Sequence, residues 1–211
     1  MFDLSRAELK RMNLFYKAVA VANKIATIAT RAAKKGIKIR WFEYSSQSRG
    51  GESYLKPVNS VELSSLKVGR YNALEYLGLS SADKMSLVYN APLEESGPPV
   101  LFSAESLFDF SNSIPWKNNM LITAPHHGSE ANAVVYEKLE DYEENNEDIN
   151  PVWVRSDSEN HHRPCEEYIN ASGNRFCTVC NNPPRNKQPV KLKVKKGKWV
   201  PEGNTNKCHC K

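Results

Sequence analysis

Hydrophobic residues near the start of the chain recur at three- and four-residue intervals, which is typical of an amphipathic helix. Ser5 and Glu8 form an S-x-x-E pattern that favours a helix start, and Gly36 is a residue type that often ends a helix. A helix is therefore expected between Ser5 and Gly36. The apolar positions of its stripe are Leu9, Met12, Phe15, Val19, Ala22, Ile25, Ala26 and Ala29.

Beyond residue 36, short apolar runs alternate with polar connections. Strands are expected in IKIRWFEYS, KMSLVYNAP, PPVLFSAES, NNMLITAP, NPVWVRSD, VKLKV and KWV, with LEESG joining the second and third of them as a hairpin. Helices are expected in NALEYLGLSSADK and ANAVVYEKLEDY, and SQSRGGESYLKPVNS is expected to be a loop. Strands that alternate with helices predict an α/β fold, and the hairpin predicts a mixed sheet.

Three of the expected strands run into polar clusters. Glu105 follows the first, His126 and His127 follow the second, and His161 and His162 follow the third. Imidazole nitrogens and carboxylate oxygens are ligands that zinc accepts, and a bound metal generates hydroxide near neutral pH. The alternative is that the two adjacent histidines only form hydrogen bonds in a turn before the next helix.

PHHGS after a strand, with FSAES before it and SENHHRP after it, resembles the second half of metallo-β-lactamase-fold hydrolases. The closest resemblance is to the branch found in DNA-uptake competence proteins of the ComEC type, over about residues 36–164. It implies that His126 or His127 binds a metal or contacts the scissile group. It also implies that Glu105 replaces a metal-bridging aspartate and that His162 corresponds to the last histidine of the family. The implied activity is metal-dependent hydrolysis, including phosphodiester cleavage in nucleic acid.

The chain departs from this family in its N-terminal part. The family's H-x-H-x-D-H motif is absent, and no histidine precedes His126. Ala104 stands where the family has a glycine, and Arg163 separates His162 from Pro164. Residues 1–164 therefore resemble the C-terminal half of an αββα sandwich, which would be inactive alone and would leave an apolar sheet face uncovered. Three alternatives are open: another chain supplies the missing half, the tail covers the exposed face, or the sequence is a fragment of a longer protein.

The tail, residues 165–211, is expected to be a small cysteine-containing β unit. Cys177 and Cys180 form C-x-x-C, and Cys208 and Cys210 form C-x-C. Two short-spaced cysteine pairs are typical of a structural zinc site, in which His209 would be a substitute for one cysteine. The alternatives are reduced buried thiols, or disulfides if the protein is exported.

Composition places the chain among soluble globular proteins, since 40% of its 211 residues are hydrophobic and 25% are charged. It has neither an apolar run long enough to span a bilayer nor a secretory signal, so a cytoplasmic location is expected. The stretch from Arg185 to Lys198 contains seven cationic residues and no acid. This predicts nucleic-acid contact through the tail, unless the lysines form only a solvated strand face. The second functional hypothesis is thus a non-catalytic, zinc-stapled module that binds nucleic acid or protein.

Overall fold

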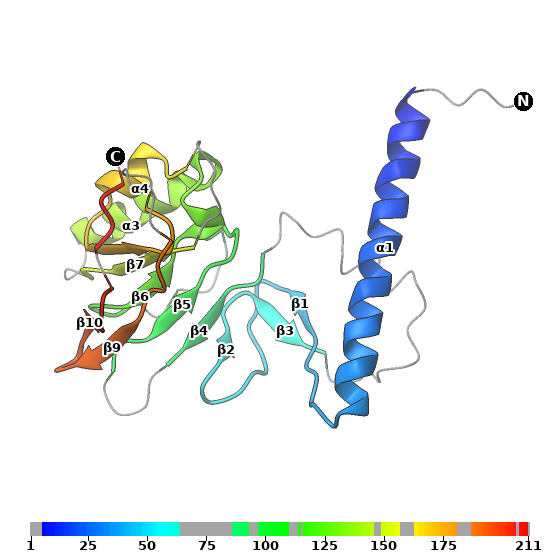
Figure 1. Ribbon diagram of the computed structural model, residues 1–211, viewed down its shortest axis with the longest axis horizontal. Coiled ribbons are helices and arrows are strands. Elements are labelled where there is room, and N and C mark those ends of the chain that lie inside the picture. The colour runs from blue at the N-terminus through cyan, green and yellow to red at the C-terminus, as the bar shows by residue number, and fades with distance from the viewer. Residues whose placement is uncertain are drawn as a thin grey trace, which may run out of the picture. The chain divides into compact units, whose positions relative to one another are not determined.

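The computed structural model describes residues 6–63, 86–92, 97–109, 114, 116–145, 149–156, 163–180, 187–205 and 207–210 (Figure 1). The chain divides into two compact units. The first comprises Met1–Glu43 and Glu62–Asp83, and the second comprises Tyr44–Val61 and Lys84–Lys211. The predicted domain boundary at residue 164 falls inside the second unit and stays a prediction.

The first unit contains the long helix α1, Arg6–Lys34, which confirms the helix expected from the apolar periodicity. Gly36 ends it with a left-handed backbone (φ 70°), and the next amide, of Ile37, donates to the Ala32 carbonyl at 3.0 Å. This is the hydrogen-bond pattern of a glycine C-cap. The apolar stripe is not buried along its whole length, since Phe15 is 54% exposed. No helix in the described part of the chain has the length and apolarity needed to cross a membrane.

The second unit is built on a six-stranded sheet in the order β2-β4-β5-β6-β7-β8. The two pairings among β2, β4 and β5 are antiparallel, and the three pairings from β5 to β8 are parallel. The expected hairpin and the mixed α/β character are therefore confirmed. The strands are β2 (Lys56–Pro57), β4 (Tyr89–Ala91), β5 (Val100–Phe102), β6 (Leu121–Thr123), β7 (Val152–Arg155) and β8 (Asn174–Cys177).

The region between the first helix and the sheet differs from expectation. The strand expected at 37–45 is confined to β1, Phe42–Tyr44, which pairs with β3, Ser60–Glu62. The stretch 46–60, expected to be a loop, is irregular apart from isolated bridges, the two residues of β2 and the first residue of β3, so that prediction is correct only in part. The strand β2 forms because the edge of β4 offers backbone hydrogen-bond partners to this segment, although the segment is rich in turn-forming residues. The helix expected at 72–84 lies outside the described residues.

Two helices cover one face of the sheet. They are α3, Val134–Asn145, which confirms the predicted helix, and α4, Glu166–Asn170. Tyr136 of α3 and Tyr168 of α4 both pack edge-on against Trp153 of β7, with ring centroids 5.2 and 6.4 Å away. This aromatic cluster, in which all three side chains are almost completely buried, fixes both helices to the strands that lead to the candidate sites.

The opposite face of the sheet is less completely covered. On this face Val100, Thr123 and Val154 are half-buried and Phe102 is 44% exposed, but Leu121, Val152 and Phe176 are buried. In contrast, Leu101 and Ile122 on the helix side are fully buried. The metallo-β-lactamase-like sandwich stays a prediction.

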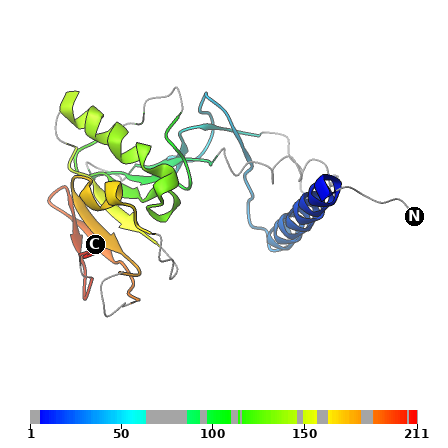
Figure 2. The same cartoon turned by 90° about the horizontal axis from the view of Figure 1, so that it is seen from above.

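The tail continues from the sheet into a hairpin of β9, Leu192–Lys195, and β10, Lys198–Pro201, which confirms both predicted strands. Lys196 and Gly197 join them with φ values of 51° and 70°. Two positive φ values in a two-residue connection define a type I′ turn, whose twist matches that of the strands. Figure 2 shows the hairpin, in orange and red, at the end of this unit opposite α3.

Candidate functional site

The loops that follow the parallel strands β5, β6 and β7 lie at one edge of the sheet. The His126 amide donates to the Ala104 carbonyl at 2.9 Å, and the Ala124 amide donates to the Val154 carbonyl at 2.9 Å. Parallel strands place their carboxyl ends together, and side chains from several loops can then converge. The segments that carry Glu105 and the two histidines are thus neighbours in the fold.

The backbone at this edge is unusual. Ala104 (φ 48°), His126 (φ 45°) and His127 (φ 58°) are left-handed, and Gly128 (φ 77°) follows them. A left-handed residue other than glycine costs roughly 1–2 kcal/mol, and such strain is concentrated at functional sites. We call His126–Gly128 the histidine turn.

Both ring nitrogens of His126 are engaged by protein groups. Nε2 lies 3.0 Å from Nη2 of Arg163, and Nδ1 lies 3.2 Å from Oδ1 of Asn132. Because a guanidinium only donates, Nε2 accepts, which assigns the proton of the neutral ring to Nδ1. Nδ1 then donates to the asparagine oxygen. In this arrangement His126 has no nitrogen left for a metal.

His127 is arranged differently. Its Nδ1 donates to the backbone carbonyl of Ser156, directly after β7, so the lone pair of the neutral ring stays on Nε2. A histidine that binds a metal nearly always donates its other ring nitrogen to such an acceptor. The sequence left the choice between His126 and His127 open, and this geometry favours His127 as the ligand.

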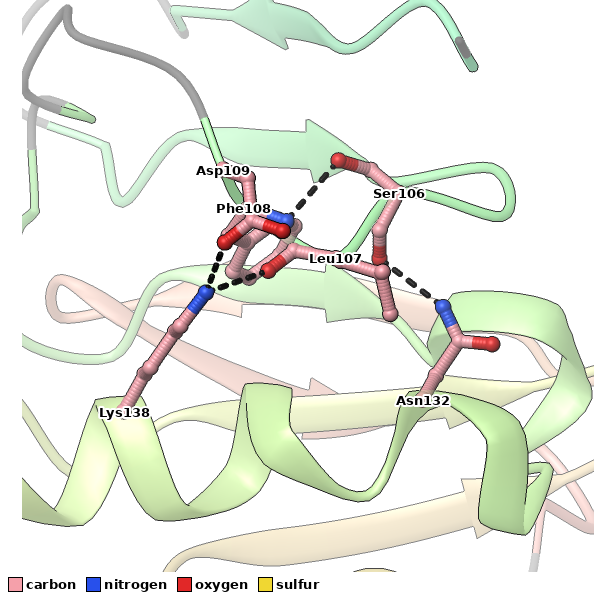
Figure 3. Close-up of polar contacts among 6 residues, drawn as sticks. All are labelled: Ser106, Leu107, Phe108, Asp109, Asn132 and Lys138. Atoms are coloured by element: carbon pink, nitrogen blue, oxygen red, sulfur yellow. Dashed lines mark hydrogen bonds and ion pairs between the residues drawn. The ribbon is translucent and has the colours of Figure 1, made fainter. Parts of the chain in front are cut away.

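The segment after β5, which carries Glu105, is fixed through its backbone (Figure 3). The buried Asn132 donates from Nδ2 to the carbonyls of Glu105 and Ser106, both at 3.0 Å. Lys138 of α3 forms an ion pair with Asp109 at the far end of the same segment. Asn132 therefore joins His126 to this loop, while the Glu105 side chain itself is exposed.

The histidine turn does not complete a metal site within the described residues. Among those residues, a single group of three or more metal-binding side chains has its ligand atoms close together, and it does not include Glu105, His126 or His127. His162 lies outside the described residues, so its predicted role is not placed.

That group is formed by Cys177, Cys180, Cys208 and Cys210, whose sulfur atoms all lie within 4.8 Å of one another. We call it the cysteine cluster. All four are free thiols, and the sulfur atoms of Cys180 and Cys210 are 3.8 Å apart. Cys177 ends β8, and the Cys208 amide donates to the carbonyl of Arg175 in β8 at 2.7 Å, which brings the end of the tail alongside that strand.

Several N–H groups point at the sulfurs of the cysteine cluster. The His209 amide lies 3.4 Å from Cys180 Sγ, and the Cys210 amide lies 3.5 Å from Cys208 Sγ. Such donors stabilise thiolates and orient metal ligands. His209 was predicted as a substitute ligand, but its position between two cysteines contributes the backbone amide, and the four sulfurs form the group without its ring.

Two thiols of the cluster, those of Cys177 and Cys208, have raised pKa values. Hydrogen bonds with Cys208 and then Cys210, followed by burial, raise the pKa of Cys177. The hydrogen bond with Cys177 lowers the pKa of Cys208, but the contact with Cys210 and burial outweigh it and raise that pKa to about 11. Four thiolates at this spacing would repel one another, and a bound dication removes that repulsion.

Three residues that sequence reasoning did not select position these groups. Asn132 and Arg163 hold His126, and the fully buried Arg155 donates from Nη2 to Cys210 Sγ at 3.4 Å. Arg155 carried the clearest sequence signal, since it is a charged residue at the end of an apolar strand. Asn132 sits in the predicted helix, and its partners become visible only in the fold.

No family model, curated protein or solved structure matches this chain. The resemblance to metallo-β-lactamase-fold hydrolases therefore stays a prediction. The functional proposals below rest on the geometry of the histidine turn, the cysteine cluster and the hairpin.

Proposed function

We propose that this protein is a zinc-stapled module that binds nucleic acid through its β9–β10 hairpin. The observation that carries the proposal is the convergence of four cysteine sulfurs within 4.8 Å. Thiolates in a four-ligand set favour zinc, and a site closed by four protein ligands is structural rather than catalytic.

The position of the cluster explains what zinc would stabilise. Cys177 and Cys180 precede the hairpin, and Cys208 and Cys210 follow it, so an ion bound to both pairs closes the loop that contains β9 and β10. Because folding brings the two cysteine pairs together, the free energy of metal binding stabilises the folded tail. The hairpin is then presented from a rigid base at the end of β8.

The hairpin has two different faces. Lys195 is paired with Lys198, and Lys193 with Val200, so these three lysines share one face, and all are exposed. Val194 and Trp199 are paired on the other face. Lys193 forms an ion pair with Glu202, with Nζ and Oε1 3.3 Å apart. The exposed ammonium groups of Lys195 and Lys198 suit the evenly spaced charges of a phosphate backbone, which is why nucleic acid is the proposed partner.

Salt dependence tests the nucleic-acid proposal. Binding of the zinc-loaded chain to a fluorescent single-stranded or duplex oligonucleotide is expected to weaken steeply as salt rises. Lys195→Gln combined with Lys198→Gln should reduce the slope of log K against log salt by about 1.8 for duplex, because each phosphate contact contributes roughly 0.9.

Lys117→Gln is the matched control, since Lys117 is an exposed lysine of the same unit outside the hairpin. It should leave the slope unchanged. Failure of the chain to bind at low salt would overturn the nucleic-acid proposal, as would an equal loss of slope in the control.

Metal analysis tests the zinc proposal. Chain purified in the presence of zinc should contain one ion, and Cys208→Ser should lose it. Cys165→Ser is the matched control, because Cys165 is a free cysteine outside the cluster. An absence of bound zinc in the unchanged chain would sink this part of the proposal.

A second candidate function is metal-dependent hydrolysis of phosphodiesters, favoured by the left-handed backbone of the histidine turn and by the Nδ1 bond of His127. His127 would be a ligand through Nε2, Glu105 would occupy the bridging position, and the bound metal would supply hydroxide. The remaining ligands would come from the chain or segment that carries the missing half.

The test of this second candidate is the native locus upstream of Met1. An in-frame H-x-H-x-D-H motif is expected there or in a partner that co-purifies, and the completed protein should cleave DNA or RNA. His127→Ala should then abolish cleavage. Full activity of that variant would remove His127 from the proposed ligand set.

A further inference from the structure

We propose that Arg155 is a positioning residue that couples metal binding at the cysteine cluster to the conformation of the histidine turn. The metal centre would then regulate the candidate catalytic edge as well as hold the tail. This inference rests on the proposed zinc centre, and the experiment below separates failure of one from failure of the other.

One end of Arg155 belongs to the cysteine cluster. Arg155 is the last residue of β7 and is completely buried. Its Nη2 donates to the Val179 carbonyl at 2.7 Å, between Cys177 and Cys180, and to Cys210 Sγ at 3.4 Å. The guanidinium therefore contacts both cysteine pairs, one through the backbone and one through sulfur.

The other end of Arg155 supports the histidine turn. Its Cδ would lie 3.4 Å from a Cβ added at Gly128, so the arginine stem fills the space beside that glycine. The residues on either side of Arg155 are also tied to the turn region, since the Val154 carbonyl accepts from Ala124 and the Ser156 carbonyl accepts from His127. We expect a shift of Arg155 to reach the histidine turn through these two hydrogen bonds, one between backbone groups and one from the His127 ring to a backbone carbonyl.

The charge of the cluster depends on the metal. A dication held by four thiolates leaves two net negative charges beside the Arg155 guanidinium, whose Nη2 contacts Cys210 Sγ. A fully buried guanidinium is stabilised by a neighbouring anion. Metal binding therefore strengthens the hydrogen bond from Arg155 to Cys210. A resulting displacement of Arg155 would move the end of β7, where the Ser156 carbonyl accepts a hydrogen bond from His127.

Histidine NMR provides the test. The full chain is labelled with 15N-histidine and titrated with zinc, and ring signals are assigned with single His→Gln variants. His209 lies between two cysteine ligands, so its signal reports metal binding itself. In the unchanged chain, zinc is expected to shift the ring nitrogens of both His209 and His127.

Arg155→Met is expected to keep the His209 shift, to lose the His127 shift, and to bind zinc about 10- to 100-fold more weakly, as is usual when a residue that supports the ligands is removed. Arg155→Lys retains the positive charge but lacks the guanidinium with its several N–H donors. Compared with Arg155→Met, it should recover part of the zinc affinity and show a reduced His127 shift. It provides the comparison if the methionine variant does not fold.

The outcomes are distinguishable. A His209 shift without a His127 shift in the unchanged chain overturns the coupling and leaves the zinc centre intact. A His127 shift of undiminished size in Arg155→Met, or in Arg155→Lys when the first variant is unfolded, also overturns it. An unchanged chain that binds no zinc overturns the proposed zinc centre itself, and the coupling with it.

Discussion

The histidine turn and the cysteine cluster each follow a strand of the same parallel sheet, but they treat their ligand atoms in opposite ways. In the turn, both nitrogens of His126 are bound by Asn132 and Arg163. In the cluster, four sulfurs lie within 4.8 Å of one another, and the pKa values of Cys177 and Cys208 are raised. In the first region the ring nitrogens of His126 are occupied by protein groups, and in the second the four sulfurs are close enough together to hold a metal ion.

This difference shows that residue type alone does not identify a metal site. Histidines at a strand end are excellent ligands in principle, yet the structure uses His126 as a hydrogen-bonding group. The cysteines lack comparable bonding alternatives, because a thiol is a weak donor and a weak acceptor. Their convergence therefore indicates metal binding more directly than the adjacent histidines do.

Removal of metal should have the largest effect on the free energy of unfolding. If it had no effect, the contrast between the cysteine cluster and the histidine turn would not hold. Zinc at 1,000 times its dissociation constant should stabilise the second unit by about 4 kcal/mol, because it binds the folded state alone. Thermal unfolding with zinc and with a chelator measures this difference. Equal unfolding midpoints with zinc and with chelator would show that the cluster, like the turn, is stable without a metal ion.

Asn132→Ala tests the claim that the turn is held by protein groups. It removes the acceptor of His126 Nδ1 and the donor to two carbonyls, so the loss in unfolding free energy should be about 3 kcal/mol. Asn90→Ala is the matched control, because Asn90 is also buried but its Oδ1 has no hydrogen-bond partner among the described residues. Chemical denaturation should show a much smaller loss there, and equal losses would contradict the assigned network.

Gly128→Ala tests the backbone of the turn. The added Cβ would lie 3.2 Å from Pro164 Cβ in a residue with φ 77°, and the expected loss is about 2 kcal/mol. Gly203→Ala has a similar positive φ of 61° with nothing within 4 Å of the added Cβ. Its loss should be about 1 kcal/mol, from strain alone. A larger loss at Gly203 than at Gly128 would mean that the turn is not closely packed.

Much of the fold was predictable because its signals are local. Apolar periodicity located α1 and α3, the two short-spaced cysteine pairs located the cluster, and alternation located β9 and β10. The strand β2 was missed, since its sequence is dominated by turn-forming residues and its pairing depends on the distant strand β4.

The partners of the candidate ligands were not predictable. Arg163 is 37 residues from His126, and Arg155 is 55 residues from Cys210. These contacts are created by strand order and helix packing, which determine the neighbours of each strand end. The sequence could identify His126 and His127 as candidates, but it could not show that only one of them keeps a nitrogen available.

High pH should have the smallest effect, and it acts on the residue between the two regions. Tyr168 packs beside Gly128, and burial, followed by the charges of Cys208 and other neighbours, raises its pKa well above 10.0. Above pH 10 the unfolded chain loses this proton while the folded chain retains it, so the free energy of unfolding falls as pH rises, by about 1.4 kcal/mol per pH unit for this group.

Tyr168→Phe should remove that part of the slope at little cost near neutral pH, because the buried hydroxyl has no hydrogen-bond partner within the described residues. Tyr54→Phe, at a ring that is 69% exposed, is the control for denaturation curves recorded from pH 8 to 11. An alkaline slope that Tyr168→Phe leaves unchanged would show that the space between the turn and the cluster admits water, and that the two regions are less tightly joined than their shared contacts with Arg155 imply.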